Sequence, residues 1–354
     1  MMTETDIIIT KVERSKLKDI NLENIPFGKY FTDHMLEADY ENGEWKNVEI
    51  KPYQPLLLEP SLSALHYGQS IFEGIKAYKN ADGEAYIFRP EENFKRFNNS
   101  ARRMSMPEIP EEIFMEGMRQ LLELDKNWIP NKKDHSLYIR PFMFGTAKTL
   151  GVRPSDTYKF LIVLSPTGPY YSVPMKIKIE ERYTRACPGG VGYAKNAGNY
   201  GASMIAAAEA KKEGYDQVLW TDGFEHKWLQ EVGMMNVFFV VNDTVLTPSL
   251  EGGTILAGIT RDSVITLLKE MGYKVEERKI NIDELVAAYD KNELKEAFGT
   301  GTAATVAYIE KLKYQDKVME LNPASFTIMP KIRKAINDIK EGRVEDTHHW
   351  MYKI

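Results

Sequence analysis

A short run rich in proline and glycine interrupts the chain close to its middle, in the stretch from Ser165 to Tyr171 (SPTGPYY). Proline lacks a backbone N–H and glycine is costly to order, so such a run ends the regular structure on either side of it. A chain of 354 residues is also too long for one comfortable hydrophobic core. We therefore predict a small N-terminal domain over residues 1–165, an interdomain loop over residues 166–176 and a larger C-terminal domain over residues 177–354.

Apolar patterning on both sides of this loop predicts a mixture of helices and strands. For example, Phe94, Phe97 and Ala101 recur on one face of a helix that starts at Pro90. Strands are predicted over residues 85–88, 136–141, 159–164, 175–181, 217–221, 236–241 and 244–247. Further helices are predicted over residues 111–125, 202–212 and 330–340, and from an N-cap at Thr260 to Gly272. The fold is thus mixed α/β, and no Gly-x-Gly-x-x-Gly fingerprint of a dinucleotide-binding domain is present.

The composition is that of an ordinary globular protein. Hydrophobic residues make up 43% of the chain, charged residues 27%, and the net charge is -5, so we expect no nucleic-acid or membrane partner. The N-terminus lacks a signal peptide pattern and no apolar run approaches the ~20 residues of a membrane span, which favours a cytoplasmic protein. The single cysteine, Cys187, cannot form an intrachain disulfide, and we interpret it as a small semi-buried side chain. We expect no metal site.

Lys195 is distinguished from the other lysines by its small neighbours. It lies in the stretch Val191–Gly201 (VGYAKNAGNYG), where glycine and alanine on both sides would let a planar molecule approach the backbone closely. A lysine that forms a Schiff base needs a neutral amine, which burial and nearby cations supply by lowering its pKa. Most lysines are solvated surface residues, so the residues alone make Lys195 a candidate and no more.

Glu231 is a second candidate, because it lies between apolar strand residues in Leu229–Asn236 (LQEVGMMN). A carboxylate in apolar surroundings needs a partner. That partner could be an arginine, in a structural salt bridge, or the protonated nitrogen of a pyridine ring. The second pairing would keep the ring cationic, so that it could accept electrons from a carbanion.

Two loops have the pattern of a phosphate cradle. Residues 256–261 (LAGITR) come directly before a predicted helix, whose free N–H groups and positive dipole end favour an anion. Residues 299–304 (GTGTAA) contain glycines that allow a concave row of N–H groups. Either loop alone is equally typical of a simple turn.

Seven motifs, in the same order, give the chain a strong resemblance to the branched-chain aminotransferases. That family has the fold-type IV architecture of pyridoxal phosphate enzymes, in which a small α/β domain precedes a larger pseudo-barrel domain. The resemblance extends from about Phe27 to Trp350. The motifs are Phe27–Met35 (FGKYFTDHM), Leu65–Gly68 (LHYG), Phe72–Ala77 (FEGIKA), Tyr138–Pro141 (YIRP), Gly198–Gly201 (GNYG), Glu231–Asn236 (EVGMMN) and Phe298–Ala303 (FGTGTA).

The resemblance implies a cofactor, pyridoxal 5′-phosphate, and a role for each residue that binds it. Lys195 would be the Schiff-base lysine, and its released amine would move a proton between the substrate α-carbon and C4′ of the cofactor. Glu231 would hold the pyridinium nitrogen, and Tyr200 the phenolic oxygen. The phosphate would be bound by Arg96, with Arg185 nearby, and by Ile259, Thr260 and Thr302.

The resemblance also implies an aromatic pocket for an aliphatic side chain. Tyr67, Arg140 and the Thr302–Ala303 amides would bind the substrate carboxylate. Leu150 and Val152 resemble residues that the neighbouring subunit contributes, which implies a homodimer with shared active sites. Residues 166–171 would form an interdomain lid. The walls would be Phe27, Tyr67, Phe72, Tyr138 and Tyr170, each of which is otherwise typical of ordinary core.

Four positions depart from the family pattern or leave a choice open. Ala304 and Ala307 stand where a longer subgroup often has a Cys-x-x-Cys redox pair, so that switch should be absent. Met234 replaces a smaller residue on the pocket floor, which affects side-chain preference. Lys76 could bind the γ-carboxylate of glutamate or be a surface lysine.

These expectations lead to one main functional prediction. The protein would catalyse reversible transamination between leucine, isoleucine or valine and 2-oxoglutarate, in branched-chain amino acid biosynthesis or degradation. The alternatives are another fold-type IV enzyme, such as a D-amino acid transaminase or an aminodeoxychorismate lyase, and a cofactor-binding module without turnover. The YIRP motif and the early FGKYFTDH stretch favour the branched-chain group, and the presence of Lys195 and Glu231 argues against a module without turnover.

Overall fold

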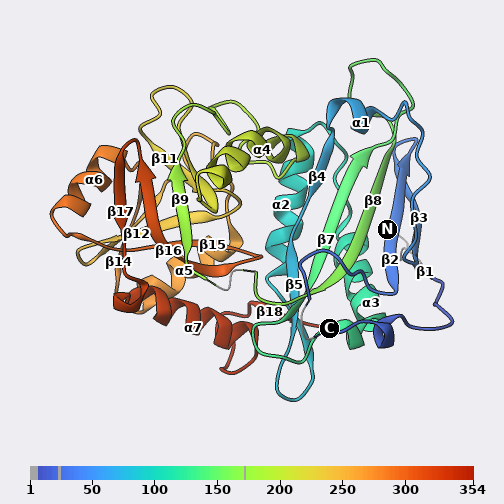
Figure 1. Cartoon of the computed structure of the whole chain (residues 1–354). Coiled ribbons are helices and arrows are strands. Elements are labelled where there is room, and N and C mark those ends of the chain that lie inside the picture. The colour runs from blue at the N-terminus through green and yellow to red at the C-terminus, as the bar shows by residue number, and fades with distance from the viewer. Residues whose placement is uncertain (1–6, 23–24, 171–172) are drawn as a thin grey trace. The chain divides into compact units, whose positions relative to one another are not determined.

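The computed structural model describes residues 7–22, 25–170 and 173–354, which form two compact units (Figure 1). The described part of the first unit comprises residues 7–22, 25–170, 194–198 and 338–354, and that of the second comprises residues 173–193 and 199–337. The short segment around Lys195 therefore groups with the N-terminal half of the chain. The boundaries of independently folding domains, placed by the sequence at residues 165 and 177, stay a prediction. Residues 171 and 172 of the predicted interdomain loop, the first of which is also the last residue of the predicted lid, lie outside the described residues.

The first unit contains a nine-stranded sheet in the order β1-β3-β2-β8-β7-β5-β6-β18, with β4 paired to β7 (Figure 1). Apart from the parallel pair β1–β3, the strands are antiparallel. The β2–β3 hairpin, which the sequence analysis did not predict, turns at Asn42 and Gly43, both with positive φ (56° and 84°). The strands are β1 (Ile8–Ile9), β2 (His34–Glu41), β3 (Glu44–Pro52), β4 (Ser70–Phe72), β5 (Ile75–Lys79), β6 (Ala85–Phe88), β7 (Ser136–Gly145), β8 (Tyr158–Thr167) and β18 (Met351–Lys353).

Helices cover one face of this sheet and form the main core of the first unit. Phe97 of α2 and Leu121 of α3 pack there with strand residues such as Ile139 and Phe160. The helix predicted over residues 111–125 begins with a π-helical turn, Glu112–Glu116, and continues as α3. The helices are α1 (Ser63–Tyr67), α2 (Pro90–Arg103) and α3 (Gly117–Leu124), with 3₁₀ turns at Leu17–Asp19 and Lys126–Trp128.

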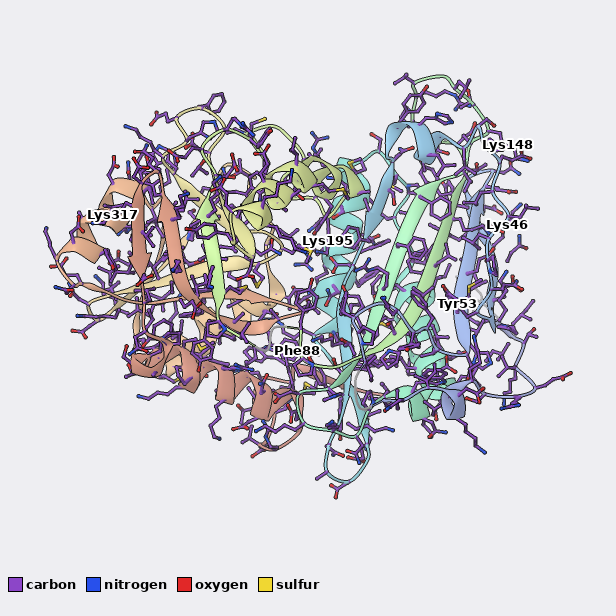
Figure 2. The ribbon with its side chains drawn as sticks, viewed as in Figure 1. Lys46, Tyr53, Phe88, Lys148, Lys195 and Lys317 are labelled. Carbon is purple, nitrogen blue, oxygen red and sulfur yellow. The ribbon has the colours of Figure 1, made fainter. Side chains whose placement is uncertain are left out.

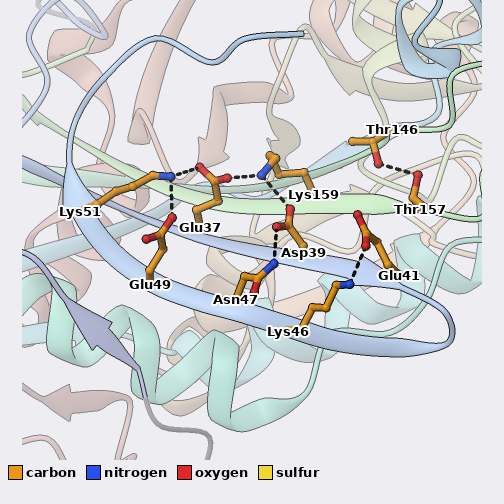
Figure 3. A network of polar contacts seen from close by, with 10 residues as sticks. All are labelled: Glu37, Asp39, Glu41, Lys46, Asn47, Glu49, Lys51, Thr146, Thr157 and Lys159. Carbon is orange, nitrogen blue, oxygen red and sulfur yellow. Dashed lines mark hydrogen bonds and ion pairs between the residues drawn. The ribbon is translucent and has the colours of Figure 1, made fainter. Parts of the chain in front are cut away.

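Charged residues form a network on the other face of β2, β3 and β8 (Figure 3). Lys51 pairs with Glu37 at 2.9 Å and with Glu49 at 2.7 Å, and Lys159 pairs with Glu37 and with Asp39. A pocket of about 630 Å³ opens beside it. Its lining contains four carboxylates (Asp39, Glu41, Glu59 and Asp156) against two ammonium groups (Lys148 and Lys159). This excess of negative charge makes the pocket unsuitable for a phosphate group.

The second unit contains a mixed nine-stranded sheet in the order β11-β10-β9-β16-β15-β12-β13-β14, with β17 paired to β16. Strand β9 is parallel to β10 and β16, and β13 is parallel to β14. Its core includes Ile177, Val237, Phe239 and Ile309. The strands are β9 (Met175–Ile179), β10 (Gln217–Thr221), β11 (Leu229–Val232), β12 (Asn236–Val241), β13 (Thr244–Pro248), β14 (Lys274–Arg278), β15 (Leu294–Gly301), β16 (Thr305–Tyr314) and β17 (Lys317–Glu320).

Two predicted helix starts differ from the structure. Helix α4 begins at Ala197 instead of about residue 202, and the buried Asn199 donates a side-chain hydrogen bond to the Val191 carbonyl (2.9 Å), which helps to offset the poor helix propensity of glycine and asparagine. Helix α5 begins at Ile259 with Gly258 as its N-cap, and Thr260, the predicted N-cap, is buried within the first turn. The remaining helices are α4 (Ala197–Lys212), α5 (Ile259–Glu270), α6 (Ile282–Asp290) and α7 (Ile328–Lys340), with a 3₁₀ turn at Pro323–Ser325.

The buried carboxylate of Glu296 caps the start of α7. It accepts hydrogen bonds from the backbone N–H groups of Thr327, Ile328 (2.8 Å) and Met329 (2.8 Å). We expect Glu296→Gln to lower the free energy of unfolding by about 1–3 kcal/mol, because an amide nitrogen cannot accept from these donors. Urea denaturation would measure the loss, with the exposed Glu251→Gln as the control; equal midpoints for both variants would contradict the prediction.

Candidate active site

Backbone contacts within the first unit fix the segment that carries Lys195. The Lys195 N–H donates to Ser100 Oγ of α2 (2.9 Å), and the Phe72 N–H of β4 donates to the Lys195 carbonyl (3.0 Å). The neighbouring Asn196 forms a bridge with Ile71. The Lys195 side chain, labelled in Figure 2, is half-buried, and its ammonium lies 4.9 Å from the centroid of the Phe72 ring. Backbone hydrogen bonds thus hold Lys195 in place while its amine lies over the Phe72 ring.

Arg96, predicted to bind a phosphate, lies in a buried pair with Glu73. Its Nε and Nη2 donate to the two Glu73 carboxylate oxygens at 2.7 and 2.8 Å, and Asn93 donates to the same carboxylate at 2.7 Å. Burial raises the pKa of Glu73, but the charges of Arg96 and Lys195 and these hydrogen bonds outweigh it, so this pKa lies below its usual value. The sequence analysis missed Glu73 as a functional residue, although it lies within the quoted FEGIKA motif.

Four predicted pocket aromatics lie together in the first unit. Phe27 makes edge contacts with Tyr138 (4.9 Å between ring centroids) and with Tyr170 (5.0 Å), and burial raises the pKa of Tyr170. Arg140 lies over the Phe72 ring at 4.6 Å and donates to the Tyr138 hydroxyl at 2.9 Å. We call these five residues the aromatic wall. A side chain at Gly74 would come within 2.2 Å of the Tyr138 hydroxyl, which explains the glycine there.

The three other predicted substrate residues of the first unit form a separate, exposed group. Tyr67 donates from its hydroxyl to the Leu150 carbonyl. The exposed fractions of Tyr67, Leu150 and Val152 are 42%, 65% and 84%. Among the described residues, no hydrogen bond or ring contact joins this group to the aromatic wall. Exposed apolar side chains of this kind are typical of surfaces that bind a partner.

Arg185 and Glu231 form a buried ion pair in the second unit, 2.8 Å apart and each about 6% exposed in its side chain. Arg185 also donates to the carbonyls of Thr254 (2.9 Å) and Gly192 (3.2 Å), and Glu231 accepts from the Leu256 N–H (3.1 Å). The arginine partner that the sequence left open for Glu231 is therefore Arg185. These contacts also join Glu231 directly to the loop over residues 256–261.

In both predicted phosphate loops, the backbone of a glycine packs closely against a neighbouring residue. Asn236 donates to the Leu256 carbonyl (3.0 Å), and a side chain at Gly258 would come within 1.9 Å of the Asn236 amide oxygen. Ile259 then opens α5, whose first N–H groups have no partner within the helix. Gly299 and Gly301 lie against Met235, and Thr302 and Ala303 form the turn that follows β15. Tyr200 lies on α4, and Met234 is half exposed in the turn before β12.

These residues fit a cofactor that carries a phosphate and a pyridine ring. The glycine at position 258 and the start of α5 suit a phosphate. The Glu231 carboxylate is buried beside that loop, as the partner of a ring N–H must be. No cluster of three or more acidic, histidine or cysteine side chains that could hold a metal ion occurs in the described part of the chain. Among the described helices, none is long and apolar enough to cross a membrane.

Comparison with known proteins gives a consistent result. A family model for class IV amino-transferases matches residues 70–312. A probable branched-chain-amino-acid aminotransferase of Staphylococcus aureus (strain N315) is 50% identical over 348 residues, 96% of this chain and 97% of the relative. Branched-chain-amino-acid transaminase 1 of Bacillus subtilis (strain 168) is 47% identical over 337 residues, 94% of each chain. The solved structure of the T.th. branched-chain amino acid aminotransferase, complexed with N-(5′-phosphopyridoxyl)-L-glutamate, has a TM-score of 0.73, 28% identity, and covers 89% of this chain and 97% of its own.

The fold, the site and these matches define a class IV aminotransferase. Within that class, the chain belongs to the branched-chain-amino-acid aminotransferase family. The predicted fold class is confirmed, since the protein has the two sheets and mixed α/β architecture of fold-type IV. The prediction that the protein is a transaminase is confirmed as well.

Proposed function

We propose that the protein catalyses reversible transamination between branched-chain L-amino acids and 2-oxoglutarate, with pyridoxal 5′-phosphate as its cofactor. The observation that carries the proposal is the aromatic wall beside Lys195, an apolar surface with one guanidinium, next to an amine. An aliphatic side chain gains free energy by leaving water against such a surface, while Arg140 offers a partner to a carboxylate. The names of the relatives and the ligand of the T.th. structure support the same assignment.

When bound, the cofactor supplies an aldehyde for the amino group and a ring that withdraws electrons from the substrate α-carbon. Lys195 would hold the cofactor and, once its amine is free, would move the substrate α-proton. Glu231 would accept a hydrogen bond from the ring nitrogen and keep it protonated, and Tyr200 would bind the phenolic oxygen. The phosphate would be bound by Arg96, Ile259, Thr260 and Thr302, with Arg185 nearby.

The substrate would be bound by residues of this chain and of a second copy. Tyr67, Arg140 and the amides of Thr302 and Ala303 bind the α-carboxylate, and Phe27, Phe72, Tyr138 and Tyr170 surround the side chain. Leu150 and Val152 serve the neighbouring active site, in a homodimer located in the cytoplasm. Their exposed fractions of 65% and 84% support a role at a subunit interface.

Purified protein with added pyridoxal 5′-phosphate, leucine and 2-oxoglutarate should produce glutamate and 4-methyl-2-oxopentanoate. The aliphatic side chain fits the aromatic wall, so isoleucine and valine should react as well. Coupled detection of glutamate measures all three rates. A higher rate with D-alanine than with L-leucine would favour the D-amino acid transaminase alternative, and no turnover with any amino donor would overturn the proposal.

A further inference from the structure

A single buried hydroxyl, that of Ser100 on α2, joins the segment of Lys195 to the helix that carries Arg96. Its Oγ accepts the Lys195 backbone N–H at 2.9 Å and donates to the Arg96 carbonyl at 3.1 Å, one turn earlier in the same helix. A hydroxyl has one donor and two acceptor positions, so it can make both bonds at once. The proposed function gives Ser100 no role.

The two bonds of this hydroxyl differ in what they imply. A serine often donates to the carbonyl one turn earlier in a helix, and that bond needs no special explanation. The bond that Ser100 accepts comes from a residue 95 positions away in the chain. Lys195 precedes α4, which begins at Ala197, so its N–H lies outside any helix. Because the flanking residues Ala194 and Asn196 are buried, this N–H depends on the protein for an acceptor.

Contacts on the other side of Lys195 complete a closed path. The Lys195 carbonyl accepts from the Phe72 N–H at 3.0 Å, and Phe72 lies on β4, which packs against α2. The next residue, Glu73, holds the Arg96 guanidinium through two hydrogen bonds. The path from Lys195 through Ser100 and Arg96 returns through Glu73 and Phe72, all within the first unit. Ser100 is the link of this path that joins Lys195 to α2.

We propose that Ser100 is a positioning residue for the transamination, because its hydroxyl fixes the backbone of Lys195 relative to that of Arg96. The inference rests on the proposed function, in which Lys195 bonds to the cofactor and Arg96 binds the cofactor phosphate. Pyridoxal 5′-phosphate is a rigid ring with a short phosphate arm, so its two points of attachment must lie at a set separation. An error in that separation is costly, since a misplacement of ~1 Å can lower a rate by about 10²-fold.

The hydrogen bond to Ser100 holds the backbone of Lys195 and leaves the side chain able to move. In the proposed function the amine is bonded to the cofactor at one stage and moves a proton at another. A long, flexible side chain can reach both positions from one place when its Cα stays fixed. The backbone hydrogen bonds with Ser100 and Phe72 provide that fixed point without using the amine.

The first test measures cofactor binding to the apoenzyme of Ser100→Ala. The rate at which added pyridoxal 5′-phosphate forms its Schiff base, followed by absorbance, should fall about ten- to hundredfold, because the amine is no longer held in place. Pyridoxine 5′-phosphate has the ring and the phosphate but no aldehyde. Its affinity, measured by calorimetry, should stay within about twofold of the wild-type value, since the Arg96 side chain keeps its contacts with Glu73.

The second test measures turnover and substrate binding separately in the Ser100→Ala holoenzyme. The kcat for leucine transamination should fall about ten- to hundredfold, since proton transfer depends on the position of the amine. The affinity for 4-methylpentanoate, an unreactive analogue of leucine, should stay within about twofold, because the substitution leaves the aromatic wall unchanged. The melting temperature should fall by only a few degrees, as expected for the loss of two hydrogen bonds from a chain of this size.

Three further variants isolate the hydroxyl. Ser100→Thr keeps a hydroxyl that can bond one turn back in a helix, so it should recover most of the rate of Schiff base formation. Ser100→Cys keeps the size of the side chain but has only a weak donor and acceptor, so it should show a smaller loss of the same kind, and it replaces Ser100→Ala if that variant does not fold. Thr266→Ala removes a hydroxyl that donates to the Asp262 carbonyl one turn earlier in α5 (3.1 Å), and it should change none of these rates.

Two outcomes would overturn the inference. One is a wild-type rate of Schiff base formation in the folded alanine or cysteine variant. The other is an equal loss of this rate and of the affinity for pyridoxine 5′-phosphate, which would indicate that Ser100 only stabilises the site as a whole. If the wild-type enzyme converts leucine in either case, the proposed function stands and only the role of Ser100 fails. If the wild type forms no Schiff base at Lys195, the proposed function fails first.

Discussion

Lys195→Ala should lower the rate of leucine transamination by about 10⁴-fold, the upper end of what one positioned proton-transfer group contributes. The reason is that, in the proposed function, the amine both holds the cofactor and moves the α-proton, and the methyl group of alanine can do neither. The backbone contacts of this segment, from Lys195 to Ser100 and from Phe72 to Lys195, do not involve the side chain, so they survive the substitution. The loss should therefore appear in kcat with the fold intact.

Three controls separate this role from a general effect. Lys212→Ala, which removes an exposed lysine at the end of α4, should keep full activity. Borohydride reduction of the wild-type holoenzyme, followed by peptide mass spectrometry, should find the cofactor mass on Lys195. Small primary amines should restore part of the rate in Lys195→Ala, since they supply the missing base. Retention of more than about a tenth of the wild-type rate in Lys195→Ala would show that another group moves the proton.

The parts of the fold that sequence predicts well are those with local signals. Pro90 and the apolar spacing after it predict α2, whose observed limits are Pro90–Arg103. The predicted start of α4 was wrong because the interaction that favours a helix at this point is not local in sequence. Glycine and asparagine argue against a helix at residues 198–201, and the hydrogen bond from Asn199 to Val191 that favours it depends on the folded loop.

The candidate site shows the same difference between local signals and contacts that only the fold creates. The small neighbours of Lys195 and the apolar neighbours of Glu231 are visible in the sequence, and the family motifs supply their roles. The pairing of Glu73 with Arg96 could not be found in this way, because the two residues are 23 apart in the chain and only the folded first unit brings them together.

Glu73→Ala should lower the free energy of unfolding by about 3–5 kcal/mol, the usual cost of breaking a buried ion pair by removing one partner. The Arg96 guanidinium would remain in the interior without the two carboxylate oxygens that now lie at 2.7 and 2.8 Å. Removing both charges in Glu73→Ala/Arg96→Met should recover most of this loss, because no unpaired charge is left. Urea denaturation of the three proteins, with unchanged slopes, measures the difference.

The pH dependence of the free energy of unfolding provides a second test of the Glu73–Arg96 ion pair. The pKa of Glu73 in the folded protein lies below the 4.5 of the unfolded chain, so the folded state binds fewer protons in that range. The stabilisation is therefore complete above about pH 4.5 and is lost as pH falls through the folded pKa, and Glu73→Ala should lack that part of the acid transition. In the proposed function the phosphate of the bound cofactor is a second anionic partner for Arg96, so Glu73→Ala should lose less stability in the holoenzyme than in the apoenzyme. Equal losses in both forms would show that Arg96 does not bind the phosphate.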